Sequence, residues 1–197
     1  VSPSDHAIFN ETGFIANINE AVSMADRYNW ILTMGAMPTN PNTKYGYIQS
    51  QEEPATNLTH EIHKVVTFTE KPPLEMATQF IASGEFLWNA GIFIWSLPVL
   101  KKAFQEHLPN IYESFFTIDL NTPRATLDHI YATADAISID FGIMEKANNV
   151  YVMKAGFGWS DIETWDSLYQ TIPHGAEDNA FASGKILTYA SHNCMFH

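Results

Sequence analysis

The stretch Phe157–Trp165, with the sequence FGWSDIETW, decides the fold because it joins a strand to a helix through a glycine-flanked turn. The residues before it, Asn149–Lys154, predict a strand, and the residues Asp161–Ile172 predict a helix. Asp161 therefore falls at the junction between the two elements. Ligand crevices of open α/β sheets lie at such strand ends, so Asp161 is a candidate for phosphate or metal chemistry.

A second acid with a similar setting stands near the start of the chain. Val1–His6 (VSPSDH) reads as the last residues of a strand entering a turn, so Asp5 is also expected at a strand's carboxyl end. Two such carboxylates can share one divalent cation. Asp5 could also be a turn residue or a helix N-cap, and Asp161 could serve the dipole of the following helix with Ser160 as the N-cap. The residues alone leave both interpretations open.

The rest of the chain alternates between strand and helix patterns, which is typical of a mixed α/β domain. An amphipathic helix is predicted over Glu11–Arg27, because apolar residues recur there at three- and four-residue spacing, namely Phe14, Ile15, Ile18, Val22 and Ala25. Strands are predicted at Trp30–Gly35, Tyr45–Gln49, Lys64–Phe68 and Phe86–Trp95, the second and third of which are expected to pair. Further helices are predicted at Pro73–Ala82, Leu97–Glu106, about Ile111–Phe116 and Arg124–Ala134.

The composition is that of a globular domain. With 197 residues, 46% of them hydrophobic, the chain is long enough for one sizeable core. Its longest apolar runs are far shorter than the ~20 residues that a membrane span needs. Cys194 is the one cysteine, which excludes an intramolecular disulfide and favours a reducing cytosol. We expect Cys194 to be a small apolar residue in a strand.

The charge balance restricts the partners. Ten basic residues against 22 acidic ones give a formal net charge of −12. This argues against nonspecific binding to nucleic acid or to anionic membranes, since both depend on Lys and Arg. An enzyme that handles phosphate with this balance needs added positive charge. A divalent cation and one or two lysines would supply it, and Lys71 is the leading candidate.

Four residues between the two acids have unusual settings. Gly46 lies inside a predicted strand, where glycine marks a bulge or the close approach of another group. Glu70 and Lys71 end a strand ahead of two prolines, so their side chains are presented at its end, although a surface ion pair would look the same. Asn89 lies in an apolar strand, and its amide needs either a ligand or a neighbouring backbone group as partner.

Two other patterns are interpreted as incidental. His60 and His63 flank Glu61 in a polar segment, and we expect these side chains to be solvated. Asn57–Thr59 matches a glycosylation acceptor, which has no role in a cytosolic protein.

Six short motifs, taken together, resemble one known family. They are Pro3–His6, Tyr45–Ile48, Phe68–Pro72, Trp88–Phe93, Ser138–Lys146 and Gly158–Asp161. Their types, order and spacing are similar to those of the mannose-1-phosphate guanylyltransferase (GDP-mannose pyrophosphorylase) family. The resemblance spans nearly the whole chain.

The resemblance implies an α/β fold with a mixed, doubly wound (Rossmann-like) nucleotidyltransferase sheet flanked by helices. The family opens with a strand and a glycine-rich loop that wraps the nucleotide triphosphate, and the present sequence has no such segment. We therefore expect residues 1–184 to be a partial nucleotidyltransferase domain truncated at both ends. Residues 185–197 would begin a following C-terminal module, with Lys185–Ala190 as its opening strand. Residues 1–197 alone are expected to show no turnover.

The resemblance also implies an activity. Mannose 1-phosphate would attack the α-phosphorus of GTP, giving GDP-mannose and pyrophosphate. By the same resemblance, Asp5 and Asp161 would hold Mg²⁺, and Asp5, Lys71 and Asp161 would form the catalytic set. The family usually has a small residue where this chain has Glu163, which we interpret as an exposed residue of the first helical turn.

The implied sugar-phosphate pocket uses the remaining candidates. Glu70 would accept hydrogen bonds from sugar hydroxyls, and Lys71 would contact the sugar phosphate. Gly46 would allow the close approach of the sugar ring, and Asn89 would bind a sugar hydroxyl.

Two alternatives to this function stay open. The chain could belong to a noncatalytic sugar-phosphate-binding or regulatory paralogue, or to a pyrophosphorylase for another sugar or base. The substrates are expected to be GTP and mannose 1-phosphate, with no nucleic-acid or membrane partner and a cytoplasmic location. The oligomeric state is left open, a homodimer included.

Overall fold

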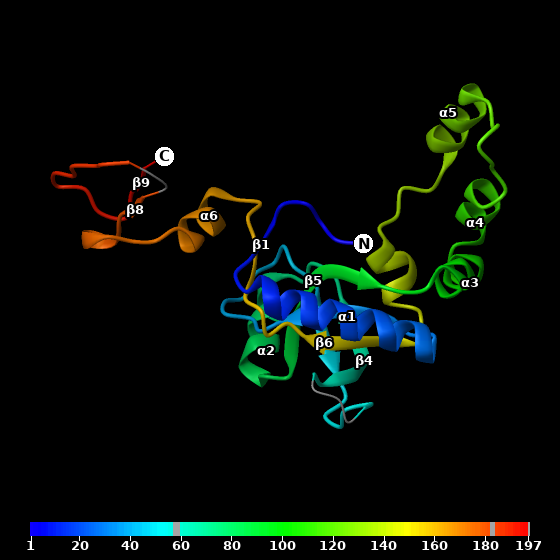
Figure 1. The fold of residues 1–197 in the computed structure, drawn as a ribbon, viewed down its shortest axis with the longest axis horizontal. Coiled ribbons are helices and arrows are strands. Elements are labelled where there is room, and N and C mark those ends of the chain that lie inside the picture. The colour runs from blue at the N-terminus through cyan, green and yellow to red at the C-terminus, as the bar shows by residue number, and fades with distance from the viewer. Residues whose placement is uncertain (57–59, 182–183, 197) are drawn as a thin grey trace.

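A computed structural model describes residues 1–56, 60–181 and 184–196 of the chain. Its strands are β1 His6–Ile8, β2 Ile31–Ala36, β3 Tyr47–Ser50, β4 Ile62–Thr69, β5 Phe86–Ile94, β6 Val150–Lys154, β7 Trp159–Asp161, β8 Ala180–Phe181 and β9 Met195–Phe196. Its helices are α1 Glu11–Tyr28, α2 Leu74–Ser83, α3 Leu97–His107, α4 Pro109–Phe115, α5 Arg124–Thr133 and α6 Trp165–Thr171, with a π-helix η1 Asp140–Met144 and a short 3₁₀-helix η2 Ala176–Asp178. These elements form a central body from which α4 and α5 extend on one side and α6 to β9 on the other (Figure 1).

The body is built on a mixed sheet, which confirms the predicted α/β class. Its strands follow the order β2-β5-β3-β4-β6, and β6 returns to β2. β2 and β6 run parallel, and the other neighbours in this order are antiparallel. The order closes on itself because the first residues of β4 pair with β6 and the later ones pair with β3. The predicted pairing of the second and third strands is confirmed, with Ile48 opposite Phe68.

The core lies on both sides of β2, which is buried along its whole length. On one side α1 packs its small residues Ala21 and Ala25 against the sheet. The predicted helix is confirmed, but Ile15 and Val22 are 58% and 51% exposed. The helix buries Ala21, Met24 and Ala25 instead, because the face of α1 that contacts the sheet is narrower than the set of apolar residues in its sequence.

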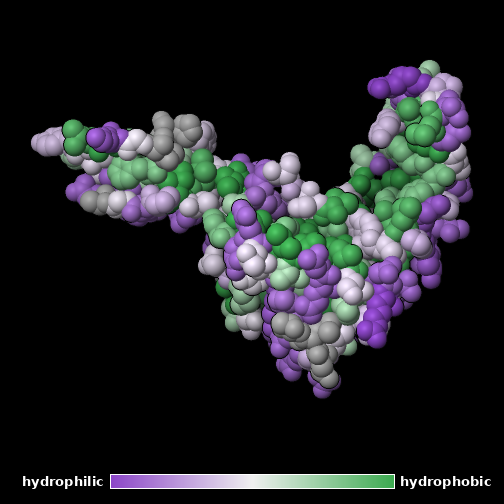
Figure 2. All heavy atoms as spheres, in the orientation of Figure 1, coloured by the Kyte–Doolittle hydropathy of each residue, from purple (hydrophilic) through white to green (hydrophobic). Residues whose placement is uncertain are grey.

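The extension that carries α4 and α5 joins the body through α3. α3 buries Val99 and Ala103 in the same core as η1, whereas α4 and α5 have no buried residue among those described. Figure 2 shows hydrophobic residues gathered in the angle between this extension and the body. Within the described ranges, every helix is too short or too polar to cross a membrane.

Two predictions about the chain around the candidate acids are wrong. The helix predicted over Asp161–Ile172 does not begin at Asp161, because Trp159–Asp161 forms β7, which pairs with β1 so that His6 lies opposite Asp161. The helix α6 begins at Trp165, because the Thr164 side chain accepts a hydrogen bond from the Ser167 amide and caps it there.

Near the start of the chain, β1 begins at His6, so Asp5 precedes a strand rather than ending one. Val1 nevertheless lies along β5, where it exchanges two backbone hydrogen bonds of 2.8 and 2.9 Å with Phe93. Of the strand end predicted over Val1–His6, only the pairing of Val1 with Phe93 is present ahead of β1.

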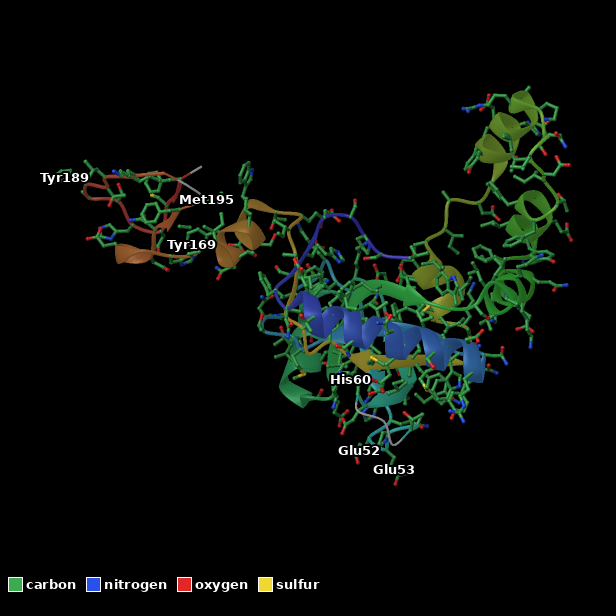
Figure 3. All side chains as sticks on the ribbon, viewed as in Figure 1. Glu52, Glu53, His60, Tyr169, Tyr189 and Met195 are labelled. Carbon is green, nitrogen blue, oxygen red and sulfur yellow. The ribbon has the colours of Figure 1, made fainter. Side chains whose placement is uncertain are left out.

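The C-terminal extension differs from its predicted form. Among the described residues 184–196, positions 185–190 form no strand, and Cys194 lies just before β9 rather than in a strand. β8 pairs in parallel with β9, so the pairing joins residues on both sides of the predicted boundary at 184. Figure 3 shows Tyr169, Tyr189 and Met195 on this extension, away from the central body. The Asn57–Thr59 glycosylation pattern lies outside the described residues.

Candidate active site

A cavity of about 250 Å³ brings together segments from both ends of the chain. Its walls come from the N-terminal segment, the residues before β3, the end of β4, the middle of β5, η1 and β7. Four of the predicted site residues line it, namely Gly46, Glu70, Asn89 and Asp161. Asp5 and Lys71 are not among its lining residues. The cavity is therefore the place where most of the sequence candidates meet.

Gly46 leaves room for a carboxylate. A Cβ atom at this position would lie 2.5 Å from Oε2 of Glu70 and 3.2 Å from Cβ of Asn89. The Gly46 carbonyl accepts a 2.8 Å hydrogen bond from the Asn89 amide, so the backbone cannot easily move away. Gly46 does not lie inside a strand as predicted, because β3 begins at Tyr47. The expected close approach is present, and the approaching group in this structure is Glu70.

Glu70 presents a buried oxygen to the cavity. Its side chain is 9% exposed, and Oε2 has no hydrogen-bond partner within the described part of the chain. Burial raises the pKa of Glu70, the Asp140 carboxylate raises it further, and the Lys71 ammonium opposes the shift. A buried acceptor without a donor is rare in folded proteins, because the lost hydrogen bond to water costs free energy. A ligand with hydroxyl donors would satisfy it.

Lys71 lies beside Glu70 in a strained conformation. Its Nζ atom is 3.2 Å from Oε1 of Glu70, and its side chain is 63% exposed. The backbone of Lys71 has φ = 48°, in the left-handed region that costs a non-glycine residue about 1–3 kcal/mol and is concentrated at functional sites. Lys71 thus combines a strained backbone with an ion pair to the Glu70 carboxylate at the cavity.

Asn89 is held by partners from three elements. Its Oδ1 atom accepts a 2.8 Å hydrogen bond from the Thr33 hydroxyl and a 3.2 Å bond from the Gly91 amide. Its Nδ2 atom donates to Oδ1 of Asp140 at 3.2 Å. The side-chain amide of Asn89 is thereby fixed in orientation, and among the described residues only one of its two N–H groups is engaged, so the other can bind a ligand.

Asp140 is a site residue that the sequence reasoning missed. The run Ser138–Lys146 is one of the motifs that carry the family resemblance, but its sequence alone predicts no role for Asp140. Asp140 begins the π-helix η1, and such turns are often found at functional sites. Burial raises the pKa of Asp140, while Lys71 and the hydrogen bonds from Ser138 and Asn89 oppose this. The acid within an otherwise apolar run was the signal available in the sequence.

Asp161 faces the cavity from β7. Its Oδ1 atom accepts a 3.0 Å hydrogen bond from the Glu163 amide, so Asp161 closes a turn and does not lie in a helix. Burial raises the pKa of Asp161, with Glu163 and Asp5 adding to the shift and His6 opposing it. His6 lies opposite Asp161 and accepts a 3.0 Å hydrogen bond from the Trp159 indole.

Asp5 and Asp161, the two predicted metal ligands, offer the kind of ligand atoms that Mg²⁺ takes. Asp5 is exposed, and its charge is close enough to Asp161 to raise the pKa of that carboxyl. The described residues contain no group of three or more His, Cys, Asp or Glu side chains that could hold a metal by themselves. Two carboxylates fit Mg²⁺, because this cation takes oxygen ligands and is commonly held by one or two carboxylates together with substrate phosphates.

A larger groove of about 930 Å³ adjoins the cavity. The two share a wall made of Lys44, Tyr45, Trp159 and Asp161. The groove runs between the segment 36–45 and the start of α6, where Glu163 also lines it. Burial raises the pKa of Tyr45 to about 12, with Asp161 and Glu163 adding to the shift, so the Tyr45 hydroxyl stays neutral beside these acids.

Comparison with known proteins places this site in context. A family model described as "Nucleotidyl transferase" matches residues 1–177. The chain is 34% identical over 206 residues to the mannose-1-phosphate guanylyltransferase of Salmonella montevideo and 32% identical over 199 residues to that of Escherichia coli. The matches cover 100% and 95% of this chain but 43% and 40% of those relatives, so the chain spans less than half of their length.

Solved structures show the same fold. A crystal structure of mannose-1-phosphate geranyltransferase from Thermus thermophilus superposes with a TM-score of 0.80 at 28% identity, covering 92% of this chain and 51% of that one. A mannose-6-phosphate isomerase structure from Helicobacter pylori has a TM-score of 0.68 at 25% identity, covering 82% of this chain and 62% of that one. Both comparisons support the mixed α/β fold.

Proposed function

Because this chain belongs to the nucleotidyl transferase family, we propose that its protein transfers a guanylyl group from GTP to mannose 1-phosphate. The products would be GDP-mannose and pyrophosphate. Two relatives of this chain are named mannose-1-phosphate guanylyltransferase. In the structure, the observation that best supports the proposed activity is the buried Oε2 atom of Glu70, which lies in the cavity beside Gly46 without a hydrogen-bond partner among the described residues. A sugar ring fits this setting, because it offers several hydroxyl donors in a small volume.

The sugar would be held by groups that are already oriented. Glu70 would accept hydrogen bonds from the hydroxyls, and Asn89 would donate its remaining N–H group, which Thr33 and Asp140 keep in place. Lys71 would contact the phosphate through its exposed ammonium. Binding in a fixed orientation supplies much of the rate in such a reaction, because it replaces a random encounter by a positioned one.

The reaction needs no catalytic base. An oxygen of the sugar phosphate forms a bond to the α-phosphorus of GTP, and the bond from that phosphorus to the β-phosphate oxygen breaks. Pyrophosphate leaves with the electron pair. The nucleophile is already anionic at neutral pH, so the protein contributes orientation and neutralises charge.

Asp5 and Asp161 would hold Mg²⁺ in this proposal. When bound, the ion would withdraw charge from the phosphate oxygens and orient them. The raised pKa of Asp161 is consistent with this role, because a cation would stabilise the ionised carboxylate that burial disfavours. We further propose a cytoplasmic location, on the evidence of the single cysteine, and we leave the oligomeric state open.

The test is a substrate panel applied to the complete natural protein. Pyrophosphate release is measured for each nucleoside triphosphate with mannose 1-phosphate, and then for GTP with other hexose 1-phosphates. The proposal predicts the highest kcat/KM for GTP with mannose 1-phosphate in the presence of Mg²⁺. A higher value for another pair would assign the pyrophosphorylase to that sugar or base. No pyrophosphate with any pair would favour the noncatalytic alternative.

A further inference from the structure

The charge of the cavity creates a problem for a phosphate ligand. Three carboxylates line it, from Glu70, Asp140 and Asp161. A phosphate monoester adds about −1.5 to −2 charges at neutral pH. Because like charges in a partly buried site repel one another strongly, a sugar phosphate needs positive charge close by. Any cationic side chain in the wall is therefore of interest.

Lys71 is already engaged by the carboxylates of the site. Its Nζ atom contacts Glu70 at 3.2 Å, and its charge lowers the pKa values of both Glu70 and Asp140 against the effect of burial. Much of its charge therefore offsets those two acids. A further cationic side chain, in addition to the proposed Mg²⁺, would help to neutralise the phosphate.

Lys44 is the one lysine or arginine among the described residues that line the cavity. It lies in the wall shared with the larger groove, on the same wall as Asp161. Within the described part of the chain, the Lys44 ammonium makes no ion pair and no hydrogen bond. Its charge is thus available to a ligand.

The backbone at Lys44 is held in place although the side chain is exposed. The Lys44 amide donates a 2.8 Å hydrogen bond to Oδ1 of Asn42. The carbonyl of Asn42 accepts a 2.9 Å bond from the hydroxyl of the fully buried Tyr47. This turn ties Lys44 to the core, two residues before Gly46. The backbone that carries the Lys44 side chain is therefore fixed beside the cavity.

We propose that Lys44 binds the phosphate group of the sugar phosphate and so acts as a second phosphate-binding cation beside Lys71. The inference rests on the proposed function, since it requires the sugar ring to lie against Glu70. The alternative is that Lys44 only balances the acids of the groove, such as Glu163, without touching a ligand. Removal of the Lys44 charge lowers the affinity for the sugar phosphate if Lys44 contacts the phosphate, and leaves it unchanged if Lys44 only balances the acids of the groove.

The experiment measures binding of mannose 1-phosphate to the complete protein by titration calorimetry. The variants are Lys44→Met, which removes the charge, and Lys44→Arg, which keeps it. Lys102→Met is the matched control, because Lys102 is 74% exposed on α3 and lies outside the cavity wall. Lys44→Met is expected to raise Kd by about 10-fold or more, as the loss of a hydrogen bond to a charged group implies. Lys44→Arg and Lys102→Met should stay within about twofold of the wild type.

A second readout separates contact from a general effect of charge. The ³¹P resonance of the bound phosphate is titrated with pH, and a lysine in contact should lower the second pKa of this phosphate relative to the Lys44→Met complex. Equal Kd values for the wild type and Lys44→Met would overturn the inference while leaving the proposed function intact. Failure of the wild type to bind any hexose 1-phosphate would overturn both.

Discussion

Gly46 and Glu70 fit each other so closely that a Cβ atom on Gly46 would lie 2.5 Å from Oε2 of Glu70. The same carboxylate oxygen is buried and has no hydrogen-bond partner in the described residues. The glycine therefore does more than allow a backbone conformation. It provides the space that the Glu70 carboxylate occupies beside the cavity.

This relationship predicts the effect of a single methyl group. Gly46→Ala should displace the Glu70 carboxylate and raise the KM for mannose 1-phosphate by about 10-fold, since inserting a methyl group into a filled site costs about 1–3 kcal/mol. The KM for GTP should change much less. Gly156→Ala is the control, because a Cβ atom there would have nothing within 4 Å. Steady-state kinetics of the complete protein check this, and an unchanged sugar-phosphate KM in Gly46→Ala would contradict it.

Glu70 and Lys71 should have separable effects. Glu70→Gln keeps the shape of the side chain but removes its negative charge and replaces one of the two acceptor oxygens by an NH₂ donor. It should raise the KM for mannose 1-phosphate more than the KM for GTP. Lys71→Ala should also lower kcat, because the lost charge is needed as the phosphate attacks. Initial-rate measurements with each substrate varied in turn distinguish the two, and equal sugar KM values in the wild type and both variants would move the sugar site elsewhere.

The burial of Glu70 also predicts a pH dependence of stability. Burial raises the pKa of this carboxyl, so its ionisation opposes folding. The protonated Glu70 side chain therefore contributes to the free energy of unfolding. This contribution is fully present below the unfolded pKa of about 4.3 and is lost as the pH rises through the higher folded pKa. The free energy of unfolding of the wild type should therefore fall relative to that of Glu70→Gln as the pH rises from about 4 through the folded pKa.

Urea unfolding of both proteins across this pH range measures the difference directly. Glu53→Gln serves as the control, since Glu53 is exposed, does not line the cavity and lies between β3 and β4 (Figure 3). Its difference from the wild type should stay nearly constant with pH. The same flat profile for Glu70→Gln would show that Glu70 is not buried in solution.

The proposed metal ligands predict a loss of turnover without a matching loss of stability. Asp5→Asn and Asp161→Asn each remove an anionic oxygen while leaving the side-chain volume nearly constant, so kcat should fall by orders of magnitude in each. The double variant should be little worse than the poorer single one, because ligands of one ion act as a unit. The measurement is kcat against Mg²⁺ concentration, with thermal unfolding in parallel and the exposed Asp26→Asn as control.

The alternative for these acids predicts the reverse. If Asp161 only closes the turn with the Glu163 amide, Asp161→Asn keeps an oxygen that can accept this hydrogen bond, so it costs at most about 1 kcal/mol of stability and leaves turnover per folded molecule intact. A normal kcat in both single variants, with or without a lowered melting temperature, would exclude the metal assignment.

Most of the fold could be predicted because its strongest signals are local. The helix α1 and the strands β2, β5 and β6 follow apolar patterns that depend on neighbouring residues only. The assignment of Asp161 to a helix failed because the pairing partner of Trp159–Asp161, the strand β1, lies near the other end of the chain. Local propensity cannot report such a partner.

The site was predictable only in part for a similar reason. Gly46, Glu70 and Asn89 stood out as residues unsuited to their local setting, and the cavity brings them together. Asp140 was missed because its position depends on the π-helical turn that aims it at Asn89. Lys44 lies in a polar loop with no unusual pattern, and its place in the cavity wall depends on the tertiary fold.

We propose that the cavity at Glu70 binds the sugar of mannose 1-phosphate. A crystal structure of the complete protein bound to this compound is the decisive measurement. We expect at least one sugar hydroxyl within about 3.0 Å of Oε2 of Glu70, with the ring against Gly46. A sugar bound elsewhere, with Oε2 of Glu70 still lacking a donor, would contradict it.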